Sequence, residues 1–156
     1  GFWLIMFCYG GYYCSLWGLP SDFLVPSDYD GDGNTDLAVF RDGTWWIRKS
    51  TGGYTSSQWG LPTDIPVPAD YDGDGKTDLA VIRDSVWWIL KSNGAGYDRI
   101  QWGLPTDIPV PADYDGDGRA DVSVVRDGVW WILKSTGGYD SLQWGLPTDI
   151  PVPARQ

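Results

Sequence analysis

The chain has no histidine and no glutamate, and all 21 of its acidic residues are aspartates. Proton transfer in catalysis relies most often on histidine or glutamate, so the commonest general acids and bases are missing. The aspartates outside the repeated loops described below, such as Asp64, Asp107 and Asp149, lie in Pro-Thr-Asp-Ile-Pro turns, where aspartate is an ordinary turn former. The composition therefore predicts a protein that is not an enzyme.

Basic residues and long apolar runs are also scarce. The 11 lysines and arginines are scattered and form no basic stripe, which argues against a nucleic-acid partner. The apolar run from Phe2 to Tyr9 is too short to span a membrane and lacks the basic flank of a signal peptide. We therefore expect no membrane span, and no targeting segment is visible.

Cysteine occurs only twice, as Cys8 and Cys14, and the two flank Gly10-Gly11, a pair that favours a hairpin turn. Across such a turn the two thiols could form a disulfide, which would suit an oxidising compartment. The alternative is a pair of small buried thiols.

Glycine, proline, tryptophan, tyrosine, valine and isoleucine are abundant, whereas helix-forming residues are few, so the composition is that of an all-β protein. The chain also repeats itself. The string Trp-Gly-Leu-Pro begins at Trp17, Trp59, Trp102 and Trp144, at spacings of 42, 43 and 42 residues.

Each repeat contains four short strand candidates separated by turn residues. In the middle repeat they are residues 65–68, 78–82, 86–91 and 97–102. Four short strands in about 42 residues match one antiparallel blade of a β-propeller. The predicted fold is therefore all-β, with about three and a half tandem four-stranded blades of β-propeller type. Either neighbouring subunits or a longer chain would complete them.

The repeats divide the chain into four parts. Residues 1–17 align without gaps onto residues 128–144. The predicted parts are residues 1–27, which hold the second half of one blade and the first strand of the next, and three repeats at residues 28–69, 70–112 and 113–156, the last with a terminal strand.

The first part departs from the pattern, because Met6 to Tyr9 are apolar where residues 48–51 of the next repeat are polar. We interpret this segment as a docking face, either between subunits or against a further part of the protein. The alternative is a terminal cap that covers itself.

The motif Asp-Tyr-Asp-Gly-Asp-Gly-x-x-Asp occurs three times, at residues 28–36, 70–78 and 113–121. Its carboxylates at positions 1, 3, 5 and 9 would repel one another unless a cation neutralised them, and hard oxygen ligands select calcium. An EF-hand begins similarly but needs an acidic residue at position 12, where every copy has valine. The alternative is a solvated acidic turn without metal.

Three calcium sites are thus predicted, each made by four aspartate side chains and the backbone carbonyl at position 7. The ligands would be Asp28, Asp30, Asp32, Asn34 and Asp36 in the first loop, Asp70, Asp72, Asp74, Lys76 and Asp78 in the second, and Asp113, Asp115, Asp117, Arg119 and Asp121 in the third, with Asn34, Lys76 and Arg119 acting through the backbone. Each ion would lock the crossover between two strands, so binding would add to the free energy of folding.

The segment from Ile65 to Val81, with the Trp-Gly-Leu-Pro string before it, resembles the FG-GAP/VCBS repeat, whose loop also occurs in integrin α-subunit propellers and in some lectins. The resemblance covers essentially the whole chain. It implies propeller blades with calcium bound between the first two strands, in a secreted or cell-surface protein. Propellers of this family usually close with about seven blades, about twice the number that this chain supplies.

Adjacent tryptophans recur in the third strand candidate of each repeat, and neighbours in a strand face opposite sides of the sheet. We expect most of these indoles to form the core, with Trp46, Trp88 and Trp131 as the alternative platform for a ligand such as a sugar ring. An Arg-Asp pair in the preceding turn, beginning at Arg41 in the first full repeat, is expected to form salt bridges or turn hydrogen bonds.

From these observations we expect a non-enzymatic, calcium-stabilised β-repeat protein outside the cell that serves adhesion or recognition, with a carbohydrate or a protein as its ligand. A second hypothesis is a structural subunit whose copies associate through open sheet edges into a fibre or ring. A third is a lectin that uses exposed tryptophans.

Overall fold

The computed structural model describes residues 2–6 and 12–152, with side chains from Leu16 onward. Within these residues every regular element is a strand, and none is a helix that could cross a membrane. The strands are β1 (Phe2–Met6) and β2 (Tyr12–Leu16) in a hairpin; β3 (Phe23–Leu24), β4 (Leu37–Arg41), β5 (Thr44–Arg48) and β6 (Tyr54–Gln58) in the first sheet; β7 (Ile65–Pro66), β8 (Leu79–Arg83), β9 (Val86–Leu90) and β10 (Tyr97–Gln101) in the second; and β11 (Ile108–Pro109), β12 (Val122–Arg126), β13 (Val129–Leu133) and β14 (Tyr139–Gln143) in the third.

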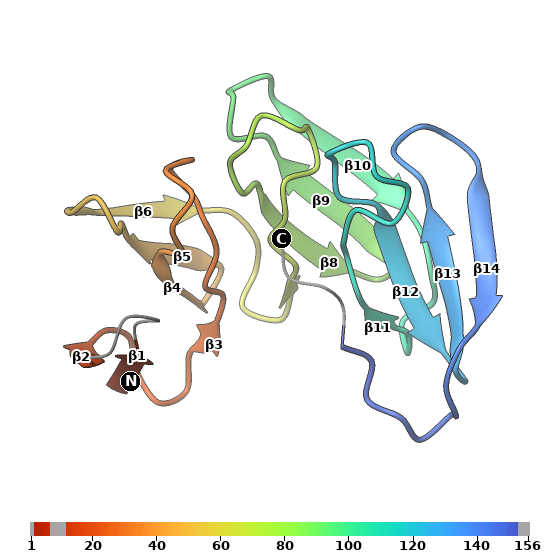
Figure 1. The fold of residues 1–156 in the computed structure, drawn as a ribbon, viewed down its shortest axis with the longest axis horizontal. Coiled ribbons are helices and arrows are strands. Elements are labelled where there is room, and N and C mark those ends of the chain that lie inside the picture. The colour runs from red at the N-terminus through yellow and green to blue at the C-terminus, as the bar shows by residue number, and fades with distance from the viewer. Residues whose placement is uncertain (1, 7–11, 153–156) are drawn as a thin grey trace.

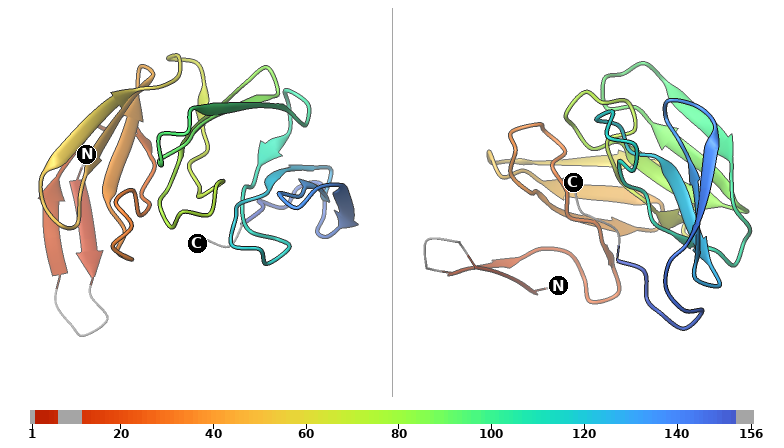
Figure 2. Two further views of the ribbon diagram at one scale, coloured as in Figure 1. Left: turned by 90° about the horizontal axis from the view of Figure 1, so that it is seen from above. Right: turned by 45° about the vertical axis from the view of Figure 1, so that its right-hand side comes forward.

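Three antiparallel four-stranded sheets therefore follow one another along the chain, and in each the strands lie in chain order (Figure 1). Seen from above, the sheets form an arc of successive blades, and no sheet among the described residues is closed (Figure 2). The predicted all-β fold of tandem four-stranded blades is confirmed.

The N-terminal hairpin has the register of the last two strands of a blade. Phe2 pairs with Leu16 in the hairpin, as Val129 pairs with Gln143 in the third sheet. Phe7, Cys8 and Tyr9 lie outside the described residues, and with Cys8 so does the predicted disulfide to Cys14.

The first strand of each sheet is shorter than the predicted four residues. Only Ile65 and Pro66 pair in ladder fashion with β8. Proline lacks the N–H that a ladder needs, so the alternation Pro-Val-Pro limits pairing at this edge. The chain remains attached to β8 nevertheless. The N–H of Val67 donates to the carbonyl of Ala80 at 2.8 Å, and Ala69 forms an isolated bridge with Asp78.

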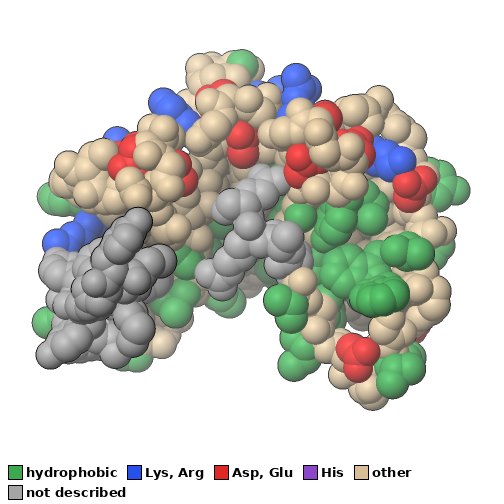
Figure 3. Space-filling model, in the orientation of Figure 1, with side chains coloured by type: hydrophobic (Ala, Val, Ile, Leu, Met, Phe, Trp, Pro, Cys, Tyr) green, Lys and Arg blue, Asp and Glu red, His purple; other side chains and the backbone are tan. Residues whose placement is uncertain are grey.

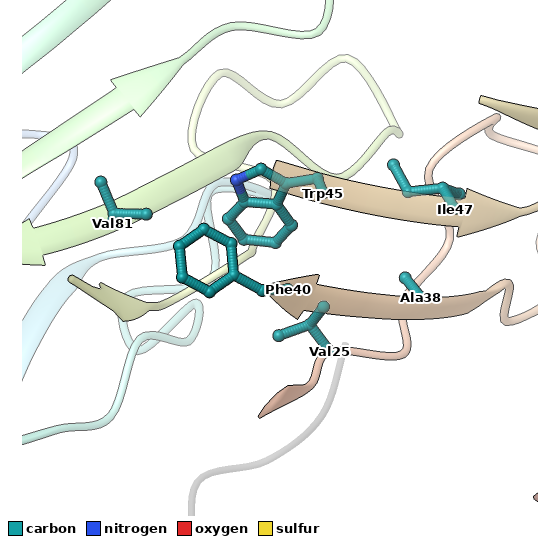
Figure 4. Packing of buried hydrophobic residues seen from close by; sticks show 6 residues of the cluster. All are labelled: Val25, Ala38, Phe40, Trp45, Ile47 and Val81. Carbon is teal, nitrogen blue, oxygen red and sulfur yellow. The ribbon is translucent and has the colours of Figure 1, made fainter. Parts of the chain in front are cut away.

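The core lies between neighbouring sheets and is built around one tryptophan of each adjacent pair. Trp45 of β5 and Trp87 of β9 are both fully buried. In the first cluster Trp45 packs with Phe40, and Val81 reaches it from the second sheet (Figure 4). In the second cluster Trp87 packs with Val124 of the third sheet. The first and second sheets thus each bury apolar side chains against the sheet that follows them.

The hairpin turn between the second and third strands of each sheet has two residues with positive φ. They are Asp42-Gly43, Asp84-Ser85 and Asp127-Gly128, so only the second sheet places a residue with a side chain at the second position. Ser85 has φ of 62°, a left-handed conformation that costs a non-glycine residue about 1 kcal/mol or more.

The variant Ser85→Gly should therefore raise the free energy of unfolding by about 1 kcal/mol, because glycine adopts this turn without strain. At this chain length the melting temperature would rise by roughly 2–4 °C, measurable by calorimetry. The reciprocal variant Gly43→Ser should destabilise the chain, since a Cβ there would lie 2.5 Å from the carbonyl oxygen of Gly60. Equal melting temperatures for Ser85→Gly and the parent chain would contradict the assignment of strain.

Candidate metal-binding loops

The three aspartate-rich loops connect the first and second strands of each sheet, and acidic side chains gather along the same edge of the molecule (Figures 1 and 3). An isolated bridge closes the base of each loop: Ser27 with Asp36, Ala69 with Asp78, and Ala112 with Asp121. The nine-residue motif is therefore held at both ends by backbone pairing.

The carboxylate at position 1 organises the turn of its own loop. In the first loop Asp28 accepts hydrogen bonds from the backbone N–H groups of Gly31, Asp32 and Gly33, at 2.7, 3.3 and 2.7 Å. Asp70 and Asp113 accept the corresponding bonds in their loops. This pattern needs a tight turn at positions 4 and 6, and glycine at both positions has positive φ in all three loops.

The carboxylate at position 9 connects the loop to the turn after the third strand. Asp36 is fully buried and accepts from the backbone N–H of Tyr29 at 2.9 Å and of Ser50 at 2.7 Å. Asp78 and Asp121 are equally buried and have the equivalent partners.

Burial raises the pKa of all three position-9 carboxyl groups above the usual value, although these hydrogen bonds oppose the shift and the neighbouring loop carboxylates add to it. For Asp78 the pKa rises to about 6. Without a cation, the loop thus holds negative charge in a place where charge is unfavourable.

Hydroxyl groups from the turn after the third strand bind the carboxylates at positions 3 and 5. Ser50 donates to Asp32 at 2.6 Å and Thr51 to Asp30 at 2.5 Å. The serines at the same place in the other sheets donate to the position-5 carboxylates Asp74 and Asp117. The sequence interpretation missed these serines, and their recurrence 14 residues after each position-9 aspartate was the available signal.

One carboxylate oxygen in each loop is buried and has no hydrogen-bond donor. It belongs to position 3 every time: Asp30 Oδ1, Asp72 Oδ2 and Asp115 Oδ1. A buried carboxylate oxygen without a partner is costly unless a proton or a cation meets it. A hard cation would satisfy this oxygen in each of the three loops. The residues present therefore suit the metal that the motif implies.

Oxygens from three carboxylates lie within 4.8 Å of one another in every loop, close enough to hold one metal ion. Positions 1 and 3 contribute in all three groups, whereas position 5 joins in the first loop and position 9 in the others. The groups are Asp28, Asp30 and Asp32; Asp70, Asp72 and Asp78; and Asp113, Asp115 and Asp121. The structure therefore brings the predicted carboxylates together, with three close oxygens in each loop where four were predicted.

The position-7 residues remain predicted ligands through their carbonyls. Their N–H groups bond to the position-5 carboxylates, as that of Asn34 does to Asp32 at 2.7 Å. Lys76 and Arg119 make the same bond in their loops. These bonds fix the backbone at position 7 beside the acidic group.

Neighbouring loops are also bonded to each other. Thr77 donates its N–H to the carbonyl of Asp28 at 2.8 Å, and Ala120 does the same to Asp70 at 2.7 Å. In addition, a Cβ placed on Gly31 would lie 3.0 Å from Cγ of Lys76, so this basic side chain passes close over the first loop. The three candidate sites thus form one bonded row, which the sequence pattern did not predict.

The predicted ligand platforms are Trp46, Trp88 and Trp131, and all three are partly buried. An arginine guanidinium lies over each ring, at 5.6 Å for Arg41 on Trp46 and at similar distances in the other sheets. These contacts are of cation–π type and occupy part of each indole face. A role for these tryptophans in ligand binding stays a prediction.

The recurring arginines bind an aspartate 19 residues earlier in the chain, not the aspartate beside them in sequence. Arg83 donates to both carboxylate oxygens of Asp64, at 2.8 and 2.7 Å. Burial raises the pKa of Asp64, but the bonds from Arg83 and from the Leu61 N–H outweigh it, so the pKa lies below the usual value. The expected salt bridges thus exist, and the acidic partner is the turn aspartate after each Gly-Leu-Pro string: Asp22 for Arg41, Asp64 for Arg83 and Asp107 for Arg126.

Comparison with known proteins supports the repeat assignment. A sequence model of the FG-GAP-like repeat matches residues 28–81 and again residues 70–124, so each match starts at an aspartate-rich loop and ends in the second strand of the following sheet. Comparisons with curated proteins and with solved structures found no match. Together the two matched segments span more than half of the chain. The chain therefore belongs to the family of proteins built from FG-GAP-like repeats.

Proposed function

We propose that this chain is a calcium-stabilised, non-enzymatic β-repeat protein that acts outside the cell in adhesion or recognition. The observation that carries the calcium assignment is the buried position-3 oxygen, which lacks a donor in all three loops. Calcium would supply positive charge at this oxygen and accept the neighbouring carboxylates as ligands. Membership of the FG-GAP-like family, whose repeats are typically extracellular, supports the proposed location.

Within this proposal the loop residues have distinct tasks. The position-3 aspartate and the position-1 aspartate hold the ion, together with the third carboxylate of each group. The position-9 aspartate fixes the loop to the strands through its two backbone N–H partners. The serine after the third strand orients the position-5 carboxylate. The ion would thereby hold the loop in the conformation that bonds to the turn after the third strand.

Titration calorimetry of the metal-free chain should count three calcium ions per chain. The variant Asp72→Asn removes the charge of the donor-free oxygen in the second loop, and we expect it to bind two ions. The matched control is Asp98→Asn, which removes one charge at a half-exposed residue paired with Lys91 outside the loops, and it should still bind three. Heat of binding that is unchanged in Asp72→Asn would contradict the assignment.

Self-association is a second candidate function, favoured by one exposed face. Trp59 and Trp102 each donate their indole N–H to a tryptophan carbonyl of the next sheet, at 3.2 Å in both cases. The equivalent Trp144 is 73% exposed, beside the exposed side chains of Leu142 and Leu146. A second copy of the chain could cover this face in the way that one sheet covers another.

Sedimentation of the purified chain with calcium, and again after chelation, tests this candidate. Self-association predicts particles larger than one chain, and the variant Trp144→Ser should reduce their size. The variant Leu142→Ser removes a smaller exposed side chain from the same face, so it should reduce the particle size less. A single monomeric species at all concentrations would contradict it, while the calcium stoichiometry would still test the first proposal.

A further inference from the structure

A tryptophan at the end of each unit of strands contacts the unit that follows it. The units are the N-terminal hairpin and the three sheets, and the tryptophans are those of the Trp-Gly-Leu-Pro strings. Trp59 donates its indole N–H to the carbonyl of Trp88 at 3.2 Å, and its ring lies against Tyr97 with 5.6 Å between the ring centroids. Trp102 makes the same two contacts with the third sheet, at 3.2 and 5.8 Å, and Trp17 makes them with the first sheet, at 3.4 and 6.3 Å. One pair of contacts is therefore repeated at each of these junctions.

The acceptor carbonyl and the tyrosine ring come from the third and fourth strands of the following sheet. Trp88 lies on β9, and Tyr97 is the first residue of β10, which pairs with β9. In the first sheet Trp46 on β5 and Tyr54 on β6 have these places. The first and second strands supply neither contact. A unit made of the third and fourth strands alone can therefore receive such a tryptophan.

Trp144 is held in the same way as the other tryptophans but meets no receiving strands within the described residues. Its N–H donates to the carbonyl of Gly128 at 2.9 Å, and its carbonyl accepts the indole N–H of Trp130 at 3.0 Å. The corresponding bonds fix Trp59 and Trp102 in their sheets. The side chain of Trp144 is nevertheless exposed, whereas those of Trp59 and Trp102 are partly buried.

The hairpin of β1 and β2 is the unit that no described tryptophan of this kind contacts, because Trp17, Trp59 and Trp102 each reach the sheet after them. Its gap-free alignment onto the end of the third repeat puts Tyr12 where that repeat has a tyrosine, and Leu4 where it has the acceptor tryptophan. The backbone register of the two hairpins agrees over all five residue pairs. The hairpin sequence thus keeps the tyrosine, and the second group is a backbone carbonyl, which any residue supplies.

We propose that Trp144 of one copy docks on the N-terminal hairpin of a second copy. Its indole N–H would donate to the carbonyl of Leu4, and its ring would lie against Tyr12. The inference rests on the self-association proposed above and names the surface that receives Trp144. Tryptophan and tyrosine suit this role, because they bury large areas and contribute strongly to protein interfaces.

The occupant is a second copy because the chain carries both surfaces and cannot join them within one molecule. The hairpin and β14 lie at opposite ends of the arc (Figures 1 and 2). Two different surfaces meet, so the association is head to tail, and each copy has one surface of each kind. An association in which Trp144 met Trp144 of the partner would leave the hairpin without a role.

Complementation between two variants of the calcium-loaded full chain tests this arrangement. Trp144→Ser removes the donor and Tyr12→Ser removes the receiving ring, so each variant alone should associate more weakly than the parent chain, by about tenfold or more. An equimolar mixture contains one intact Trp144 surface and one intact hairpin, so it should form pairs with one chain of each kind. A fluorescent label on one variant makes these mixed pairs measurable by sedimentation.

The mixed pairs also separate docking from loss of fold. Even if Tyr12→Ser disturbed its own hairpin, its Trp144 would still find the intact hairpin of the Trp144→Ser chain. The matched control is Tyr97→Ser, because Tyr97 has the same place in the second sheet but receives Trp59 within one chain, and this variant should associate as the parent does.

The outcomes distinguish this docking from self-association in general. Unchanged association of Tyr12→Ser, or a mixture no larger than the separate variants, would overturn the head-to-tail docking while larger parent particles kept self-association in place. A parent chain that is monomeric at all concentrations would overturn both.

Discussion

Removal of calcium should lower the free energy of unfolding of this chain by about 8 kcal/mol. A ligand that binds only the folded state stabilises it by about 2.7 kcal/mol per site when its free concentration is about 100 times its dissociation constant. Three loops carry the carboxylate groups that could hold an ion. At this chain length the loss corresponds to roughly 20 °C in melting temperature, measured by calorimetry in calcium and then in excess chelator.

The physical reason is the charge that the fold confines at each loop. The position-9 carboxyl groups are fully buried, and burial together with nearby carboxylates raises the pKa of Asp78 to about 6. Burial thus opposes the charged form of these groups, and a divalent cation would offset that cost. Because Thr77 and Ala120 bond one loop to the next, disorder in one loop should weaken its neighbour.

A triple variant provides the control for calcium removal. Asp30→Asn, Asp72→Asn and Asp115→Asn together remove the charge of the three donor-free carboxylates while keeping their size. We expect this variant to melt at one temperature with or without calcium. A parent chain whose melting temperature does not change on chelation would disprove a structural role for the ion.

Much of the fold could be predicted because the chain repeats. Strands of five residues, such as β8, recur in the same register in every sheet, and turns of glycine, proline and aspartate separate them. The loop carboxylates could be predicted for the same reason, since position 3 was invariant and position 7 was not. Because the pattern occurs three times, the repeats can be aligned with one another, and a position that is the same in all three is seldom so by chance.

Contacts between repeats were the part that sequence patterns did not reveal. Arg83 binds Asp64, which lies 19 residues earlier, although Asp84 is its neighbour in the chain. The bond from Thr77 to Asp28 spans 49 residues and depends on how one sheet is placed against the next. Such distances are set by packing of the sheets, and no local spacing of residue types encodes them.

Replacement of the buried Trp87 by alanine should cost about 4 kcal/mol, the second-largest effect that we expect. Trp87 is fully buried between the second and third sheets, and its N–H donates to the carbonyl of Trp102 at 3.2 Å. Removal of the indole leaves a cavity against Val124 and leaves that carbonyl without its donor. A loss of this size is a large fraction of the stability of a typical domain.

The repeat supplies a matched comparison for this variant in Trp130. This residue has the same sequence neighbours, donates to the carbonyl of Trp144 at 3.0 Å and contacts Tyr114 as Trp87 contacts Tyr71, but it is only partly buried. Trp130→Ala should therefore cost about half as much, and denaturant unfolding in calcium would measure both losses. The difference between them is the contribution of the sheet that covers Trp87. Equal losses would mean that stability resides within single sheets and that neighbouring sheets add little to one another.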